Sequence, residues 1–147
     1  MPSISIFYGS VYGNAQNVAQ SAQSFLESKD IKASLIEEPS VQDFNDADVI
    51  LVVSSTTGQG DLPPNLEWVI DDIKGQTPSF EGKRFAIVAM GDSSYGDSFC
   101  GAGKTVFNLL ESLKAQALVP LLEVDDLETL DPEADVATWL ETLIPLL

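Results

Sequence analysis

The sequence predicts an α/β fold in which five parallel strands form a central sheet and helices cover both of its faces. Short apolar runs alternate along the chain with segments whose apolar residues recur every three to four positions, which is the pattern of strands alternating with helices. Two of the runs, 47–53 and 85–90, are almost entirely apolar, as strands covered on both faces must be. No internal repeat or low-complexity linker divides the chain, so we expect a single domain over residues 1–147.

Five segments are expected to form the strands. In chain order they are residues 3–8, 33–36, 47–53, 85–90 and 117–124. We place the second and fifth at the edges of the sheet. The second is short and follows Lys32, and the fifth contains Pro120, whose nitrogen cannot donate a ladder hydrogen bond.

Four amphipathic helices are expected between and after the strands, because apolar residues recur there at helical spacing. Their apolar stripes are Ala15, Val18, Ala19, Ala22, Phe25 and Leu26; Leu66, Val69, Ile70 and Ile73; Val106, Leu109, Leu110 and Leu113; and Val136, Trp139, Leu140 and Leu143. The last helix is expected to begin near Pro132, since proline is favourable in a first turn. Trp68 lies off the stripe of its helix, and we expect it, like Trp139, to pack against neighbouring residues.

The charge of the chain restricts its partners. Seven basic and 23 acidic residues give a net charge of −16, which disfavours nucleic acids and anionic membrane surfaces. The same charge favours basic protein partners, and such complexes are expected to weaken as salt is added. The chain contains no histidine, which excludes Ser-His-Asp and Cys-His catalysis and imidazole metal ligands.

The single cysteine, Cys100, cannot form an internal disulfide or a CxxC pair, so redox chemistry would require a bound cofactor. One cysteine fits a reducing compartment. The N-terminus lacks a cationic stretch followed by an apolar run, and no apolar run is long enough to cross a membrane. We therefore expect a cytoplasmic protein.

Ligands of an open parallel sheet bind beyond the carboxyl ends of its strands, where the strand order reverses. The segment after the first predicted strand leads directly into a helix, where backbone N–H groups and the helix dipole favour an anion. It offers small and hydroxyl-bearing residues and no basic side chain: Ser10, Val11, Tyr12, Gly13, Asn14 and Ala15. This segment is either a phosphate cradle or an ordinary turn between strand and helix.

Two further polar segments follow the third and fourth predicted strands. The second segment contains Ser55, Thr56, Thr57, Gly58, Gln59 and Gly60, and its glycines allow the backbone to approach a flat ring. The third contains Gly91, Asp92, Tyr95, Phe99 and Cys100, of which Tyr95 is suited to stack on a ring. Taken singly, the second is also a glycine turn before a helix, and Tyr95 a partly exposed loop residue. Together the three segments predict a mononucleotide site with a planar ring.

Several other motifs fail. The run 101–105 imitates the end of a phosphate-binding P-loop, but Ser98 stands where the motif needs glycine. The pairs Gly58/Gly60 and Gly101/Gly103 both lack the last glycine of GxGxxG. The acidic pair, aspartate and lysine of a receiver domain are absent, and the first loop holds no phosphatase cysteine. We expect Cys100 to be a buried or site-lining thiol.

The three segments, in this order at three strand ends, resemble the flavodoxin family, and within it the short-chain MioC-like flavodoxins. The resemblance extends from residue 4 to about residue 124, and an uninterrupted fifth strand, with no insertion before the final helix, is what suggests the short-chain branch. It implies a three-layer sandwich with strand order 2-1-3-4-5, of which flavodoxin is a standard example. It also implies that residues 10–15 hold the phosphate of FMN and that the ring lies between residues 56–60 and 92–100. Flavodoxins usually cover one ring face with an aromatic residue where this chain has Thr57.

We therefore expect an FMN electron carrier that passes electrons one at a time from a basic-surfaced flavoprotein reductase to an acceptor redox protein, and that is monomeric. The acids Asp61, Asp92 and Asp97 are expected to disfavour a fully reduced, anionic flavin. Two alternatives stay open: an FMN-dependent NAD(P)H or quinone oxidoreductase, which would turn over NADPH unaided, and a flavin-free interaction module, which would not take up FMN.

Overall fold

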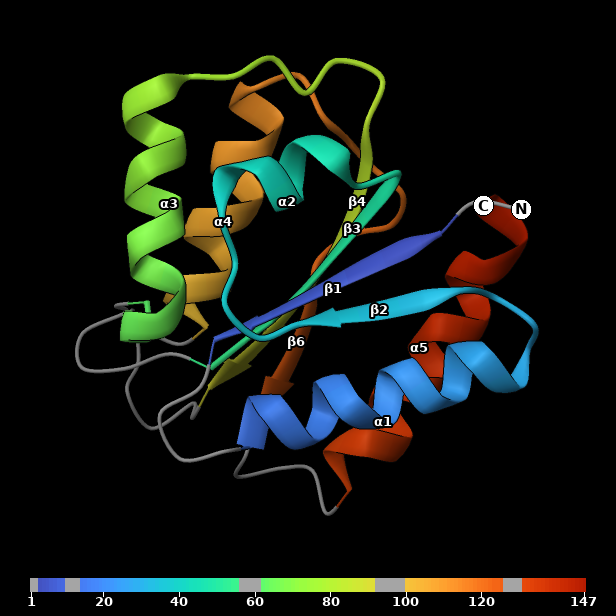
Figure 1. The fold of residues 1–147 in the computed structure, drawn as a ribbon. Helices are drawn as coiled ribbons and strands as arrows, with labels where there is room; N and C mark the ends of the chain where they lie inside the picture. The colour runs from blue at the N-terminus through green and yellow to red at the C-terminus, as the bar shows by residue number, and fades with distance from the viewer. Residues whose placement is uncertain (1–2, 10–13, 56–61, 92–99, 126–130) are drawn as a thin grey trace.

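A computed structural model of the chain describes residues 3–9, 14–55, 62–91, 100–125 and 131–147 and shows a parallel sheet between two layers of helices (Figure 1). The strands are β1 (Ile4–Gly9), β2 (Ala33–Ile36), β3 (Val49–Ser54), β4 (Arg84–Gly91), β5 (Gln116–Ala117) and β6 (Leu122–Asp125). The helices are α1 (Asn14–Ser28), α2 (Val41–Asp46), α3 (Pro64–Gln76), α4 (Gly101–Ser112) and α5 (Pro132–Leu143), followed by a 3₁₀ turn, η2 (Ile144–Leu146).

The sheet has the predicted strand order, β2-β1-β3-β4-β5, and β6 also pairs with β4. Every pairing between the described strands is parallel. The chain runs outward from β1 to β2 and then returns to the other side of β1 to form β3, so the order reverses between β1 and β3. The predicted edge positions of the second and fifth strands are confirmed.

The expectation of an uninterrupted fifth strand is wrong. Phe85 pairs with Ala117 and Val88 with Leu122, so β4 advances three residues while its partner advances five. The two extra residues form a bulge that divides the strand into β5 and β6. Pro120 lies within the bulge, and because it has no N–H it could not have continued the ladder.

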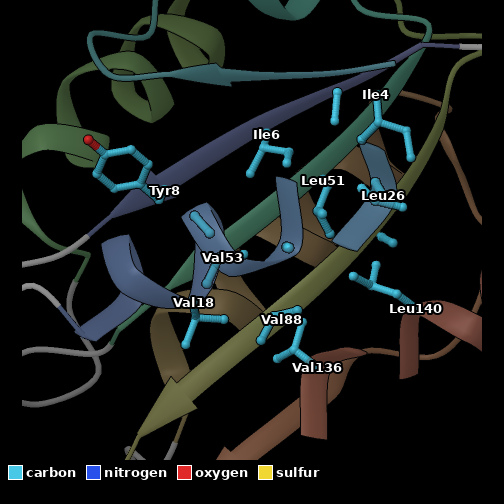
Figure 2. Packing of buried hydrophobic residues seen from close by; sticks show 14 of the residues in the cluster. Ile4, Ile6, Tyr8, Val18, Leu26, Leu51, Val53, Val88, Val136 and Leu140 are labelled. Carbon is cyan, nitrogen blue, oxygen red and sulfur yellow. The ribbon is translucent and has the colours of Figure 1, made fainter. Parts of the chain in front are cut away.

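Successive strand residues point to opposite faces of the sheet, and each face has its own core. One core joins Ile4, Ile6 and Tyr8 of β1 to α1 and α5, and Figure 2 shows Val18, Leu26, Val136 and Leu140 of these helices directed at the strands. The other core joins the intervening strand residues, such as Phe7, to α2, α3 and α4. The sheet is thus apolar on both sides, as the sequence predicts.

Four helices occupy the predicted segments, and their ends have recognisable causes. Helix α3 begins after Pro63 with Pro64 in its first turn. Helix α5 begins at Pro132, and Asp131 caps it by accepting a hydrogen bond from the backbone N–H of Ala134 at 3.1 Å.

Helix α2 was not predicted. It is six residues long, too short to show helical periodicity, and among its residues only Phe44 is buried. The Phe44 ring stacks on Phe7 with 3.9 Å between centroids. The local signal for this helix is the capping box of Ser40 and Asp43, whose side chains bond reciprocally to each other's backbone N–H groups.

The two tryptophans differ in environment. Trp139 packs against the α1/α5 core, as expected. Trp68 is 78% exposed, so the expectation that it packs against neighbouring residues is wrong. The buried stripe of α3 is filled by Leu66, Val69, Ile70 and Ile73. Position 68 therefore faces away from the sheet.

Candidate functional site

The predicted site residues come from the carboxyl ends of three adjacent strands. Gly9 at the end of β1 is paired with Ser54 at the end of β3, and Gly91 ends β4, which lies on the far side of β3. The Ser55 backbone N–H and hydroxyl both donate to the Gly9 carbonyl, at 3.0 and 3.1 Å. These two hydrogen bonds hold the start of the second predicted segment against the start of the first.

The end of β3 is polar but sealed from solvent. Ser54 is fully buried, and its hydroxyl donates to the Ser55 carbonyl at 2.9 Å. Among the residues that the structure describes, it is the only polar side chain with so little exposure. A buried hydroxyl must find a partner, and this bond fixes the backbone where the chain leaves the sheet.

The absence of a side chain at Gly9 lets the first turn of α3 pack onto the end of β1. A Cβ at position 9 would lie 3.0 Å from Leu66 Cβ and 3.2 Å from Pro63 Cγ, which is tighter than ordinary van der Waals contact. The N-terminal end of α3 is therefore fixed beside the point where the strand order reverses. Sequence reasoning did not include these α3 residues, although the Pro63-Pro64 pair marks the start of a helix at this edge.

Gly91 and Cys100 close the base of the third predicted segment. A Cβ at position 91 would lie 2.9 Å from the backbone nitrogen of Cys100, so only glycine permits this approach. Cys100 adopts a left-handed backbone with φ of 56° immediately before α4. Its thiol donates to the Ala89 carbonyl of β4 at 3.2 Å. The two ends of the segment are therefore fixed to each other and to β4.

Cys100 is fully buried, which confirms the first of the two expectations for this residue, a buried thiol or a site-lining one. Burial raises the pKa of its thiol to about 12, and the negative charge of Glu123 adds to this, while Lys104 opposes it. The thiolate is the reactive form of cysteine. A thiol held neutral in this way acts as a packing residue and not as a nucleophile.

The helices that begin at this edge differ in their first turns. Those of α3 and α5 carry acids, namely Glu67, Glu133 and Asp135. The first turns of α1 and α4 carry none. Acids normally stabilise helix N-termini, and their omission from two helices of a strongly acidic chain leaves those N-termini for another anion.

The predicted site residues fall into two groups. Ala15, Ser55, Gly91, Cys100 and the backbone of Asn14 are described, and all lie where β1, β3 and β4 end or where α1 and α4 begin. The Ala15 side chain faces the core, which leaves its backbone for binding. The predictions for Ser10, Val11, Tyr12, Gly13, Thr56, Thr57, Gly58, Gln59, Gly60, Asp92, Tyr95 and Phe99 lie outside the described residues.

The run that imitates a P-loop has a packing role. Gly103 lies in the first turn of α4, and a Cβ there would be 2.3 Å from Ala89 Cβ. The Thr105 hydroxyl donates to the Gly101 carbonyl within the same helix, at 3.0 Å. Gly103 thus allows α4 to lie close to β4.

Over the part of the chain that the structure describes, no group of three or more Cys, Asp or Glu side chains is placed to hold a metal ion. Within the same ranges, none of the helices is long and apolar enough to cross a bilayer.

A parallel sheet with this order, and with glycines where β1 and β4 end, defines a doubly wound α/β protein of the type that binds a nucleotide at its switch point. A family profile described as flavodoxin matches residues 6–139. The chain belongs to the flavodoxin family.

Individual relatives agree with this assignment. Flavodoxin YqcA of Escherichia coli K12 is 38% identical over 144 residues, covering 96% of this chain and 95% of the relative. Protein MioC of Escherichia coli O157:H7 is 31% identical over 147 residues, covering 100% and 99%. A solved cysteine-to-serine mutant of a flavodoxin from Pseudomonas aeruginosa superimposes with a TM-score of 0.89 at 38% identity, covering 95% of both chains. These relatives place the chain among the short-chain, MioC-like flavodoxins.

A longer protein contains a similar segment. The chain is 33% identical over 147 residues to part of the sulfite reductase [NADPH] flavoprotein alpha-component of Bacillus subtilis. The match covers 96% of this chain but 23% of that protein. Flavodoxins themselves are electron carriers rather than enzymes.

Proposed function

We propose that this flavodoxin binds FMN beyond the ends of β1, β3 and β4 and carries electrons one at a time between a basic-surfaced flavoprotein reductase and an acceptor redox protein. The observation that carries the proposal is the position of the three predicted segments. They leave the sheet from three adjacent strands, at the edge where the order reverses between β1 and β3.

The described residues fit an FMN with its phosphate at α1. The first turn of α1 holds no acid, so its N–H groups can receive the phosphate without repulsion from a carboxylate there. The hydroxyl and N–H groups of residues 10–14 are proposed to complete this cradle. When bound, FMN supplies a ring that accepts and releases single electrons.

The ring is proposed to lie between residues 56–60 and 92–100. The described residues at which these two segments leave the sheet are held in place, because Ser55 donates a hydrogen bond to Gly9 and Gly91 lies against Cys100. A binding segment that is held in place at its ends loses less conformational entropy when the ligand binds. Ser54 and Cys100, which lie beside these bases, are both fully buried.

A partner with a basic surface is supported by charge and by one relative. The net charge of −16 attracts basic surfaces and steers their approach. In Bacillus subtilis a similar segment forms part of a protein named as an NADPH-dependent sulfite reductase flavoprotein. A related segment is thus joined there to a reductase, which is the kind of protein that would supply electrons to this chain.

The test separates a carrier from an enzyme. The purified chain is loaded with FMN, freed of excess FMN by gel filtration, and supplied with NADPH, first alone and then with a flavoprotein reductase. A carrier consumes no NADPH alone and is reduced when the reductase is present. Steady NADPH oxidation by the chain alone would establish the oxidoreductase instead, and failure to retain FMN would refute the proposal.

A further inference from the structure

An exposed tryptophan on α3 is unusual for its surroundings. Trp68 is 78% exposed, the most exposed of the large apolar side chains described. A residue of this size is normally buried for a large part of its surface. It lies in a shallow groove of about 370 Å³ that is lined by Glu67, Trp68, Asp71 and Asp72.

The groove combines a flat apolar surface with a high density of negative charge. Asp71 and Asp72 follow Trp68 by three and four residues, the spacings that place side chains next to one another on a helix, with Cβ atoms about 5–6 Å apart. Glu67 contributes a third carboxylate. No ion pair is found between these three acids and a described lysine or arginine, and the nearest lysine along the helix, Lys74, follows Asp71 by three residues.

The groove lies close to the proposed site. Trp68 is four residues from the start of α3, which corresponds to about 6 Å along the helix axis. The first turn of α3 contacts the end of β1 through Leu66 and Pro63. Figure 1 shows this end of α3 on the side of the sheet where β1 and β4 end. A protein bound in the groove would therefore lie beside the edge at which electrons enter and leave.

We propose that the outer face of α3, centred on Trp68, is a docking surface for a basic redox partner that places an arginine side chain on the indole. This rests on the proposed function, since it names where the partner binds. Charge complementarity selects the partner: three carboxylates around one indole match a cation that also presents a flat apolar face.

Arginine matches the groove better than lysine. Its guanidinium is planar and weakly hydrated, stacks on aromatic rings and donates in a fork to carboxylates. Lysine offers a strongly hydrated point charge. Tryptophan and arginine are also the residue types most enriched where protein interfaces derive most of their binding energy.

A second copy of this chain is a poorer occupant. A symmetric dimer across α3 would bring the same patch of each copy together. Glu67, Asp71 and Asp72 of one copy would then face the same acids of the other. Like charges held together at an interface repel one another, so the groove disfavours its own copy.

The test uses the FMN-loaded full chain labelled with ¹⁵N and three probe peptides, each a short repeat of glycine alternating with arginine, lysine or citrulline. The two tryptophans give two indole N–H signals, which Trp68→Phe assigns. The arginine peptide is expected to shift the Trp68 signal and leave that of Trp139 unchanged. The citrulline peptide, which has the same shape without the charge, is expected to shift neither.

Variants test the contribution of each part of the groove. Trp68→Ala is expected to weaken binding of the arginine peptide about five-fold or more, and Trp68→Phe less, as expected for a cation on an aromatic face. The double variant Asp71→Asn with Asp72→Asn is also expected to weaken binding of the arginine peptide. Glu111→Gln with Glu141→Gln is the matched control, because it changes the net charge equally at exposed positions near the far ends of α4 and α5.

Several results would overturn the docking surface. They are binding unchanged by Trp68→Ala, equal losses in the two charge variants, a lysine peptide that binds as tightly as the arginine peptide, and self-association that depends on Trp68. All variants are expected to retain FMN. A chain that does not take up FMN refutes the proposed function, whereas one that binds FMN but not the arginine peptide at Trp68 refutes the docking surface alone.

Discussion

The close packing of α4 on β4 gives a prediction that can be worked from the structure. At Gly103 the helix lies so near the strand that an added Cβ would be 2.3 Å from Ala89 Cβ and 2.8 Å from Ala89 Cα. Carbon atoms pack at about 3.5–4.0 Å, so Gly103→Ala requires α4 to move away from β4 by more than about 1 Å. The atoms in the way belong to a buried strand, which cannot turn aside as a long side chain can.

Two opposing effects set the size of the change. Forcing an extra methyl group into a packed core costs about 1–3 kcal/mol. Alanine in a helix is more stable than glycine by about 1 kcal/mol, which offsets part of this. Because the clash involves backbone, we expect the upper end of the cost and a net loss of about 2 kcal/mol, or about 4–8 °C in Tm for a chain of this size.

The chain offers a matched control for helix propensity. Gly75 lies in α3, and a Cβ there would meet nothing within 4 Å. Gly75→Ala is therefore expected to raise the free energy of unfolding by about 0.5 kcal/mol. Both variants are compared with the parent by urea unfolding of the FMN-free chain, followed by circular dichroism, with equal m-values as a check on the two-state treatment.

A second substitution tests the cause. Ala89→Gly removes the methyl group nearest to the new Cβ, so the double variant with Gly103→Ala should lose less stability than the sum of the two single losses. If Gly103→Ala were as stable as the parent, or gained as much as Gly75→Ala, the close approach of α4 to β4 would be refuted.

Two further predictions concern the third segment. Gly91→Ala would place a Cβ 2.9 Å from the Cys100 nitrogen, so we expect FMN to bind about ten-fold more weakly, equivalent to about 1.4 kcal/mol. Binding is measured by quenching of the FMN fluorescence. An affinity equal to that of the parent would show that this contact does not shape the site. Burial raises the pKa of Cys100 to about 12, whereas an unfolded thiol ionises near about pH 8.5. The unfolded chain therefore releases this proton first, and the free energy of unfolding should fall as the pH rises above about 8.5. Cys100→Ala should reduce the slope, measured by unfolding between about pH 8 and 10, and an unchanged slope would assign the effect to other groups.

The layers and the strand order followed from patterns that repeat over many residues. The almost entirely apolar runs 47–53 and 85–90 require cover on both faces, and they form the central strands β3 and β4. Helix α5 begins at Pro132, where the proline placed it. Such predictions are reliable because many residues in the same segment support the same element.

The departures occur where a single residue or a short segment decides the structure. Helix α2 has one buried residue, Phe44, and its formation depends on a local cap. Pro120 indicates an edge strand or a bulge, but the two extra residues of the bulge between β5 and β6 are defined only by the pairing with β4. The exposure of Trp68 depends on what covers α3, and hydrophobicity alone predicts burial there.

The location of the candidate site could be predicted from the sequence, because parallel strands bring their carboxyl ends to one edge of the sheet. What sequence reasoning could not supply is the close packing beneath it. The approach of Gly91 to Cys100, and of Gly9 to Leu66, are contacts between residues brought together by the fold. The sequence shows the glycines but not the atoms that need the space.

The central claim is that FMN held by this chain passes electrons singly, and the most direct measurement is the visible spectrum of the FMN-loaded protein during stepwise anaerobic reduction. The account predicts one bound FMN per chain and two separate one-electron steps with distinct spectra. A single two-electron step would contradict the carrier and favour the oxidoreductase. A chain that stays colourless after FMN is added would contradict the site itself.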